Sequence, residues 1–323
     1  MKVMVTGGAG YIGSVTTELL LNEGLDIVVF DNLEKGHRDA VDPRAELIVG
    51  DLRNAEDISK AMAEHRPDVV VHFAAYALVG ESMDEPMMYF RNNVVGGINL
   101  LDAMLQQDVK RIVFSSTCAT YGQPDKVPIL EDESQKPANP YGDSKLMFET
   151  ILLWHQKQLK IKPVILRYFN ACGATENFGE DHNPEAHIIP LILQVAQGKR
   201  EKILIFGDDY DTPDGTCIRD YIHILDLAQA HLLALTGEHS GAFNLGNGSG
   251  SSVKEVIDVC RDITGHPIPT ELRPRRPGDP PRLIAAAEKA RDVLGWQPRY
   301  PDLRDIVQTA WDWHQAHPEG YER

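Results

Sequence analysis

A tyrosine and a lysine stand four residues apart in segment 141–145, which reads YGDSK. On an α-helix, positions i and i+4 share one face, so this spacing places a phenol beside an ammonium group. A tyrosine ordinarily has a pKa of about 10 and is a poor base at neutral pH, but a nearby positive charge favours its phenolate. We therefore expect Tyr141 to exchange a proton with a substrate, and we expect Lys145 to favour the phenolate form of Tyr141. The alternative is a solvated face of an amphipathic helix.

A hydroxyl group is expected near this pair. Thr117 follows the apolar segment 111–116, which is typical of a buried strand, and lies 24 residues before Tyr141. Ligands of open parallel sheets bind beyond the carboxyl ends of the strands. The Thr117 hydroxyl is thus predicted to bridge the Tyr141 oxygen and a substrate hydroxyl.

A glycine-rich loop, segment 7–13 (GGAGYIG), precedes the first predicted helix. Its pattern G-x-x-G-x-x-G, formed by Gly7, Gly10 and Gly13, is a spacing variant of the dinucleotide fingerprint. Glycines let the backbone approach a pyrophosphate resting on the helix N-terminus. Asp31, 18 residues after Gly13, would accept both adenine-ribose hydroxyls and repel a 2′-phosphate, which favours NAD over NADP. Asp51 would meet the adenine or, as the alternative, cap a helix.

These groups require a scaffold that carries strands and helices in alternation. Short apolar runs indicate strands covered on both faces, and longer amphipathic runs between them indicate helices. The predicted strands are residues 3–6, 27–30, 46–49, 69–73, 111–116 and 164–169, and the predicted helices are 14–22, 57–64, 94–107 and 141–159. The expected fold class is α/β, with a doubly wound parallel (Rossmann) sheet.

The regular alternation of predicted strands and helices ends after residue 170. Segments 171–183, 207–216 and 273–281 are predicted loops, while 187–197, 224–235 and 253–263 are predicted helices. We expect a dinucleotide-binding domain over 1–170 that also includes 222–238. A smaller, partly interleaved α/β substrate-binding domain is expected over 171–221 and 239–323.

Together, the glycine loop, Thr117, Tyr141 and Lys145 resemble the extended short-chain dehydrogenase/reductase family over nearly the whole chain. Three further segments are similar to those of the UDP-glucose 4-epimerases in that family: 167–170 (RYFN), 214–223 (DGTCIRDYIH) and 275–279 (RRPGD). These segments are much more specific than the cofactor loop.

The resemblance implies the remaining site residues. The cofactor, NAD held tightly as NAD⁺, would be contacted by Tyr11, Ile12, Asp31, Asn32, Asp51, Leu52, Phe73, Ala74, Asn93, Lys145 and Phe169. The UDP-sugar would be contacted by Thr117, Asn170, Arg219, Arg276 and Asp279, with the backbone near Leu204 and Phe206 holding the uracil and with His187 as a weaker candidate. An arginine group formed by Arg273, Arg275 and Arg276 independently suggests a diphosphate clamp, because guanidinium matches phosphate oxygens.

The implied reaction is NAD-dependent 4-epimerisation of UDP-glucose and UDP-galactose through a transient 4-keto sugar. The family's usual serine is Thr117 here, and Ala77 stands where some members carry a lysine. A nucleotide-sugar 4,6-dehydratase would usually carry an Asp-Glu pair directly after the strand-end threonine, where Cys118-Ala119 stand instead. A non-catalytic NAD sensor is the other alternative, against which Thr117, Tyr141 and Lys145 argue.

Sugar size is expected to depend on Leu283. The resemblance places it beside the sugar's 2-substituent, where members selective for unacetylated sugars tend to carry a tyrosine. A leucine leaves room for an N-acetyl group, so acceptance of N-acetylated UDP-sugars stays open. The alternative is that Leu283 only packs under the arginine-rich loop.

Charge and composition exclude several classes of partner. The 323 residues include 32 Lys and Arg against 48 Asp and Glu, a formal charge of −16 that disfavours nucleic-acid binding. No window has the apolar length of a membrane span, and no signal peptide is visible. The four cysteines form no C-x-x-C pair, which is typical of free thiols in the cytoplasm.

Two further expectations concern metals and assembly. The histidines of segment 181–187 (DHNPEAH) are five residues apart with a proline between them, unlike the H-E-x-x-H helix, so no metal site is expected. Apolar positions on the predicted helices 94–107 and 141–159 either cover the sheet or form a dimer interface, and the resemblance favours a homodimer.

Overall fold

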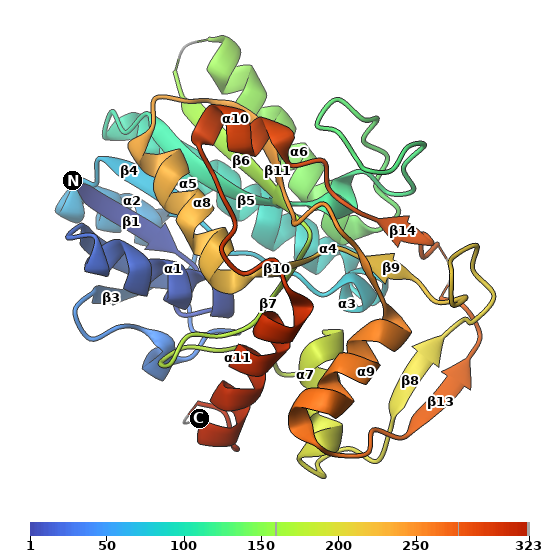
Figure 1. Cartoon of the computed structure of the whole chain (residues 1–323). Coiled ribbons are helices and arrows are strands. Elements are labelled where there is room, and N and C mark those ends of the chain that lie inside the picture. The colour runs from blue at the N-terminus through green and yellow to red at the C-terminus, as the bar shows by residue number, and fades with distance from the viewer. Residues whose placement is uncertain (159, 277, 322–323) are drawn as a thin grey trace.

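A seven-stranded parallel sheet forms the centre of the computed structural model, which describes residues 1–158, 160–276 and 278–321. Its strand order is β11-β6-β5-β4-β1-β2-β3. The strands are β1 (Lys2–Thr6), β2 (Asp26–Asp31), β3 (Glu46–Val49), β4 (Val69–His72), β5 (Arg111–Thr117), β6 (Lys162–Tyr168) and β11 (Gly241–Leu245). The predicted fold class is confirmed, and all six predicted strands lie in this sheet (Figure 1).

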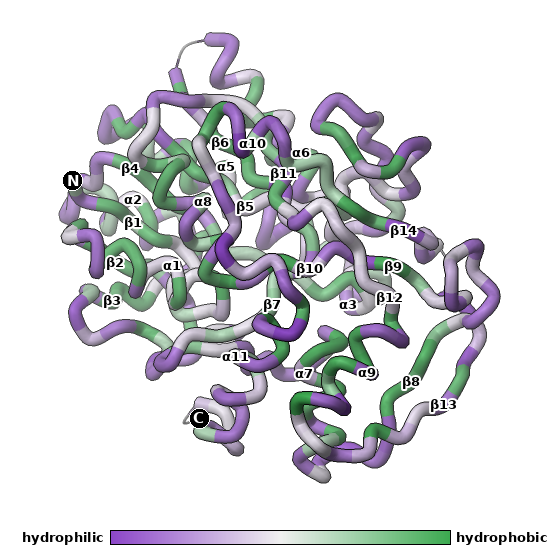
Figure 2. Tube along the Cα trace, viewed as in Figure 1, coloured by the Kyte–Doolittle hydropathy of each residue, from purple (hydrophilic) through white to green (hydrophobic). Residues whose placement is uncertain are grey.

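Helices cover both faces of the sheet because successive strand residues point to opposite sides. Val3 and Val5 pack towards one face, whereas Met4 packs towards the other. The first face is covered by α1 (Tyr11–Asn22), α8 (Ile224–Thr236) and α10 (Glu288–Leu294). The second is covered by α2 (Ala55–His65), α5 (Gly96–Gln106) and α6 (Pro140–Lys157). Figure 2 shows hydrophobic residues along inner strands such as β1 and hydrophilic residues in many of the surrounding loops.

A second hydrophobic core lies away from the sheet, at the lower right of Figure 1. It is built mainly by α7 (Ile188–Ala196), α9 (Val253–Thr264), α11 (Leu303–Ala316), β8 (Ile203–Phe206) and β13 (Thr270–Arg273). The other elements are α3 (Val79–Asp84), α4 (Pro86–Tyr89), β7 (Asn170–Cys172), β9 (Ile218–Arg219), β10 (Tyr221–His223), β12 (Ser251–Ser252) and β14 (Arg282–Leu283).

The structure corrects several predicted boundaries. Helix 94–107 is instead a π-helix over Phe90–Val95 followed by α5. The predicted loop 171–183 begins inside β7, and the loop 273–281 begins at the last residue of β13. Leu159, the predicted end of helix 141–159, and Pro277 lie outside the described residues.

One unpredicted strand bears on the domain division. β11 pairs in parallel with β6 in the central sheet, although residues 239–323 were assigned to the smaller domain. We therefore propose that the dinucleotide-binding domain includes 222–245, with the rest of the division kept as predicted.

Within the described residues, no helix has the length and apolarity needed to cross a membrane.

Candidate active site

Thr117 and Tyr141 meet at the carboxyl edge of the sheet. Thr117 is the last residue of β5, and Tyr141 lies in the first turn of α6. That helix begins where it does because the Asn139 side chain accepts the Gly142 N–H at 2.8 Å and Pro140 occupies the first turn. The Thr117 side chain lies beside the Tyr141 phenol and lowers the pKa of that phenol. The structure thus brings the predicted hydroxyl and the predicted base into contact.

Lys145 lies one helical turn after Tyr141 in α6. The residue is 3% exposed, and its ammonium donates to the Ser115 carbonyl oxygen at 2.8 Å and lies 5.0 Å from the centre of the Phe114 ring. Burial lowers the pKa of Lys145 to about 7, although the Glu149 carboxylate opposes this shift. Because burial leaves the ammonium charge weakly stabilised, Lys145 would gain from donating a further hydrogen bond, for example to a ribose hydroxyl.

The phenol itself is not acidified by the protein alone. Burial raises the pKa of Tyr141 to about 12, and the neighbouring Thr117 side chain reverses only part of the rise. Lys145 is not among the groups that lower the pKa of Tyr141 here, because it donates to the Ser115 carbonyl oxygen and burial destabilises its own ammonium form. The expectation that Lys145 and a nicotinamide cation together lower this pKa stays a prediction. Additional positive charge beside the phenol is required.

The glycine loop leaves room for a pyrophosphate. Gly7 has a φ of +76°, and a Cβ there would lie 2.4 Å from the Ala74 nitrogen. A Cβ on Gly13 would lie 2.2 Å from the Gly7 carbonyl oxygen. Gly10 precedes α1 and gives that helix no side-chain cap. The first-turn amides of α1 are therefore presented to an anion, and these residues fit a dinucleotide.

Two acidic groups border this loop. Asp31 is 7% exposed, and its carboxylate accepts the N–H groups of Ala9 at 3.0 Å and Leu33 at 2.9 Å. Asp51 accepts hydrogen bonds from Asn32 and from Arg53. The helix-cap alternative for Asp51 is wrong, because Asn54 caps α2.

Asn93 connects two parts of the cofactor side. It lies in the π-helix, an element that is frequent at functional sites. Its amide nitrogen donates to Ser144 Oγ at 2.9 Å and to the Tyr76 carbonyl oxygen at 3.1 Å. Since Ser144 lies between Tyr141 and Lys145, Asn93 fixes the helix that carries them. No sequence pattern singled out Ser144.

The other predicted cofactor residues lie around the same loop and edge. Tyr11 donates its hydroxyl to the Gly173 carbonyl oxygen at 2.6 Å. Phe73 and Ala74 pack against Gly7, and Leu52 packs beside Gly96. Ile12 follows Tyr11 in α1, and Phe169 is buried directly after β6.

The predicted uracil and diphosphate residues gather on the second core. Leu204 and Phe206 are both partly exposed positions of β8 two residues apart, so they share a face. The Arg276 guanidinium lies 4.1 Å from the Phe206 ring centre. Arg219 pairs with Asp279 and donates to the Ile218 carbonyl oxygen at 2.8 Å.

Two members of the predicted arginine clamp are engaged elsewhere. Arg273 pairs with Glu271 at 2.5 Å, and Arg275 pairs with Asp209 at 2.6 Å, both at exposed positions. Arg276, which lies on the Phe206 ring, and Arg219, which pairs with Asp279, stay the predicted phosphate-facing residues.

The remaining substrate candidates separate into two groups. Asn170 begins β7 beside the Asp220–Tyr221 backbone, and Leu283 packs against a buried cluster that contains Cys118 and Phe169. Leu283 thus lies near the residue that follows Thr117. His187 lies elsewhere, at the start of α7, with its Nδ1 facing Glu180 and Glu185.

A buried charged network behind the site was not predicted. Arg167 pairs with Glu149 at 2.6 Å, and Glu149 also accepts from the Ser116 hydroxyl. This network anchors the middle of α6 to β5 and β6. The only sequence signal was a pair of charged residues inside otherwise apolar segments.

Known proteins are similar to this chain in sequence and in fold. Residues 3–246 match the model of the NAD dependent epimerase/dehydratase family. A UDP-glucose 4-epimerase of Halalkalibacterium halodurans is 54% identical over 99% of this chain and 98% of its own length. A crystal structure of a UDP-glucose 4-epimerase has a TM-score of 0.97 at 49% identity, covering 100% of both chains.

Two further structures carry informative descriptions. The Bifidobacterium longum UDP-glucose 4-epimerase in complex with NAD⁺ and UDP has a TM-score of 0.95 at 39% identity, covering 99% of this chain and 100% of its own. The UDP-Glc/GlcNAc 4-epimerase of Campylobacter jejuni has a TM-score of 0.86 at 42% identity, covering 98% and 99%.

Proposed function

The chain belongs to the NAD-dependent epimerase/dehydratase family, and from that premise we propose that it interconverts UDP-glucose and UDP-galactose by inverting carbon 4 of the sugar. The observation that carries this proposal is the placement of Thr117 beside Tyr141, one helical turn before Lys145, at the sheet edge that also presents the glycine loop. Full-length similarity to UDP-glucose 4-epimerases supports the substrate.

Each catalytic group has one task. NAD⁺ would supply the hydride acceptor for carbon 4 and a positive charge beside the Tyr141 phenol, whose pKa is otherwise raised by burial. Tyr141 as phenolate would take the proton of the sugar 4-hydroxyl. Thr117 would orient that hydroxyl, and Lys145 would hold the nicotinamide ribose. After the 4-keto sugar has turned within the pocket, Tyr141 would return the proton to the oxygen on carbon 4.

The nucleotide stays bound while the sugar turns. Arg219 and Arg276 would hold the diphosphate, and the strand-edge groups of Leu204 and Phe206 would hold the uracil. Asp279, paired with Arg219, orients that guanidinium. Anchoring the nucleotide retains the 4-keto sugar, which prevents its escape before reduction.

The test is a product assay with UDP-galactose and no added cofactor. Formation of UDP-glucose supports the proposal, whereas a 4-keto-6-deoxy product indicates a dehydratase and the absence of any product indicates a non-catalytic NAD sensor. Dehydration lacks a donor here, because the residue after Thr117 is Cys118, whose thiol pKa burial raises to about 12.

Sugar size is predicted to depend on Leu283. Leu283→Tyr is expected to lower the turnover of UDP-N-acetylgalactosamine by roughly tenfold or more while sparing UDP-galactose, since excluding a group from a packed site costs a few kcal/mol. The measurement is kcat/KM for both sugars. Leu272→Tyr, a change at an exposed leucine of β13, serves as the control. An unchanged ratio between the sugars in Leu283→Tyr would show that this residue is not the gate.

A homodimer is proposed through α5 and α6. Among the apolar side chains of α5 and α6, Leu101, Met104 and Leu152 are buried, whereas Ile98, Met147 and Trp154 are 39%, 42% and 59% exposed. These three exposed side chains would belong to the surface that a second copy covers.

Met147→Glu is expected to shift the protein from twice its chain mass of 36.0 kDa towards a single chain. Burying a charge at an apolar interface costs several kcal/mol, which is enough to raise the dissociation constant of the dimer by about a hundredfold or more. Light scattering after gel filtration measures the mass. Val293→Glu on α10, 40% exposed, should remain dimeric. Identical masses for both variants would refute this interface.

A cytoplasmic location is proposed from the cysteines. Cys118, Cys172, Cys217 and Cys260 are all free and buried, which suits a reducing compartment.

A further inference from the structure

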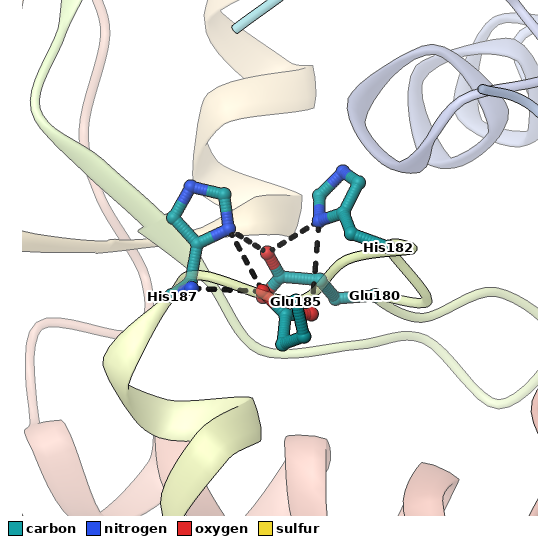
Figure 3. A group of neighbouring side chains, drawn as sticks. All are labelled: Glu180, His182, Glu185 and His187. Carbon is teal, nitrogen blue, oxygen red and sulfur yellow. Dashed lines mark hydrogen bonds and ion pairs between the residues drawn. The ribbon is translucent and has the colours of Figure 1, made fainter. Parts of the chain in front are cut away.

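Two glutamates and two histidines converge on one point in the segment after β7 (Figure 3). Glu180 Oε1 lies 3.1 Å from His182 Nδ1 and 2.6 Å from His187 Nδ1. Glu185 places its two oxygens 3.8 Å from His182 Nδ1 and 3.3 Å from His187 Nδ1. One ligand atom from each residue can be chosen so that all four lie within 4.8 Å of one another.

The cluster has a strong demand for positive charge. Both glutamate side chains are only 5% exposed, and their ion pairs among the described residues are with these two imidazoles. Buried carboxylates that face each other need compensation, which can be two protons on the imidazoles or one divalent cation.

The hydrogen bonding within the cluster is incomplete. His182 Nδ1 is buried and has no aligned hydrogen-bond partner in the part of the chain that the structure describes, although it faces both carboxylates. A buried nitrogen left in this state is costly. Its lone pair is instead placed to bind a cation between the two carboxylates.

The spacing matches tetrahedral coordination. Zinc bonds to histidine nitrogen and carboxylate oxygen are about 2.0–2.2 Å long, so the ligand atoms of a tetrahedral site lie roughly 3.4 Å apart. With Oε1 of Glu180 and Oε1 of Glu185 as the two oxygen ligands, three nitrogen–oxygen distances are 3.1, 2.6 and 3.3 Å, close to this value. Two imidazoles favour zinc over magnesium or calcium, which prefer oxygen ligands only.

We propose that Glu180, His182, Glu185 and His187 bind one Zn²⁺ ion through the two Nδ1 atoms and one oxygen of each carboxylate. This proposal revises the expectation of no metal site. The sequence argument compared the histidine spacing with a helix, whereas residues 180–187 form a loop that folds back on itself.

The ion would connect the region at the start of α1 with the region at the start of α7. The His182 ring makes an edge contact with Tyr11, 6.2 Å between ring centres, at the start of α1. His187 immediately precedes α7 of the second core. A bound ion would therefore connect the glycine-loop side to the substrate-binding side, with Nε2 of His187 still free for substrate.

The experiment uses the full-length, NAD-containing protein after dialysis against EDTA and removal of the chelator. Calorimetric titration with zinc sulfate is expected to give one ion per chain, and zinc should raise the melting temperature, since a ligand that binds the native state stabilises it. Magnesium sulfate should do neither. Less than about half an equivalent of bound zinc would overturn the proposal.

Two variants locate the ion. Glu185→Gln keeps an oxygen for the Ala186 and His187 amides, which Glu185 accepts at 2.7 and 2.8 Å, but removes the charge. His182→Ala removes a different ligand. Losing even an outer partner of a ligand weakens binding 10- to 100-fold, so each variant should lose at least about 100-fold in zinc affinity. Circular dichroism verifies that each variant is folded.

The matched control is His65→Ala. His65 Nδ1 also faces a glutamate, Glu46, at 3.6 Å, but lies outside the cluster. This variant should bind zinc as the native protein does. Native-like zinc affinity in either Glu185→Gln or His182→Ala, or a loss in His65→Ala equal to theirs, would refute the assignment.

Discussion

Tyr141→Phe is expected to lower the turnover of UDP-galactose by about 10² to 10⁴-fold, the range that a positioned acid–base group contributes. The phenol is the group placed to exchange the proton of the 4-hydroxyl, and Thr117 lies beside it. UDP affinity should change little, because the nucleotide residues lie on the second core. Steady-state kinetics and calorimetric titration with UDP separate the two effects.

The control for this change is Tyr300→Phe, a tyrosine stacked on His223 at 4.5 Å between ring centres. It loses the same hydroxyl away from the proposed chemistry and should keep nearly full turnover. If Tyr141→Phe retained more than about a tenth of the native rate, another group would have to move the proton.

Gly13→Ala is expected to remove most of the bound cofactor. The new Cβ would lie 2.2 Å from the Gly7 carbonyl oxygen and 2.7 Å from the Gly8 Cα, which are backbone atoms that cannot rotate away. Overpacking of this kind costs typically 1–3 kcal/mol, and the shifted loop loses the close approach that a pyrophosphate requires. NAD affinity should therefore fall by roughly 5- to 150-fold or more.

The measurement is the number of NAD molecules released per chain when the folded protein is denatured. The native protein should release about one, because one dinucleotide binds to each Rossmann sheet. Gly80→Ala is the matched control, because a Cβ on Gly80 meets nothing within 4 Å. A Gly13→Ala protein with native cofactor content would show that this loop does not bind the pyrophosphate.

The first half of the fold could be predicted because its signals are local. The apolar runs of β1 to β6 and the glycine loop before α1 each specify their element within a few residues. β11 could not be found in this way, since Gly241–Leu245 becomes a strand only by pairing with β6, more than 70 residues earlier. The two-residue strands β9, β12 and β14 depend on the same kind of distant pairing.

The same distinction between local signals and distant contacts applies to the site. Thr117, Tyr141 and Lys145 have spacings that predict their arrangement, and the structure brings Thr117 into contact with Tyr141. The pKa of Tyr141 could not be predicted, because it depends on burial and on the direction in which Lys145 points. The Glu149–Arg167 pair and the Glu180–His187 cluster likewise acquire meaning only from neighbours that the sequence does not place.

In the proposed mechanism, hydride leaves and returns to carbon 4 of one sugar, held by one enzyme molecule. The mechanism is tested by incubating the protein, without added NAD, with UDP-galactose carrying deuterium at carbon 4. Mass spectrometry and NMR of the product should show UDP-glucose with the deuterium retained at carbon 4. Deuterium lost to water, or moved to another carbon of the sugar, would rule this mechanism out.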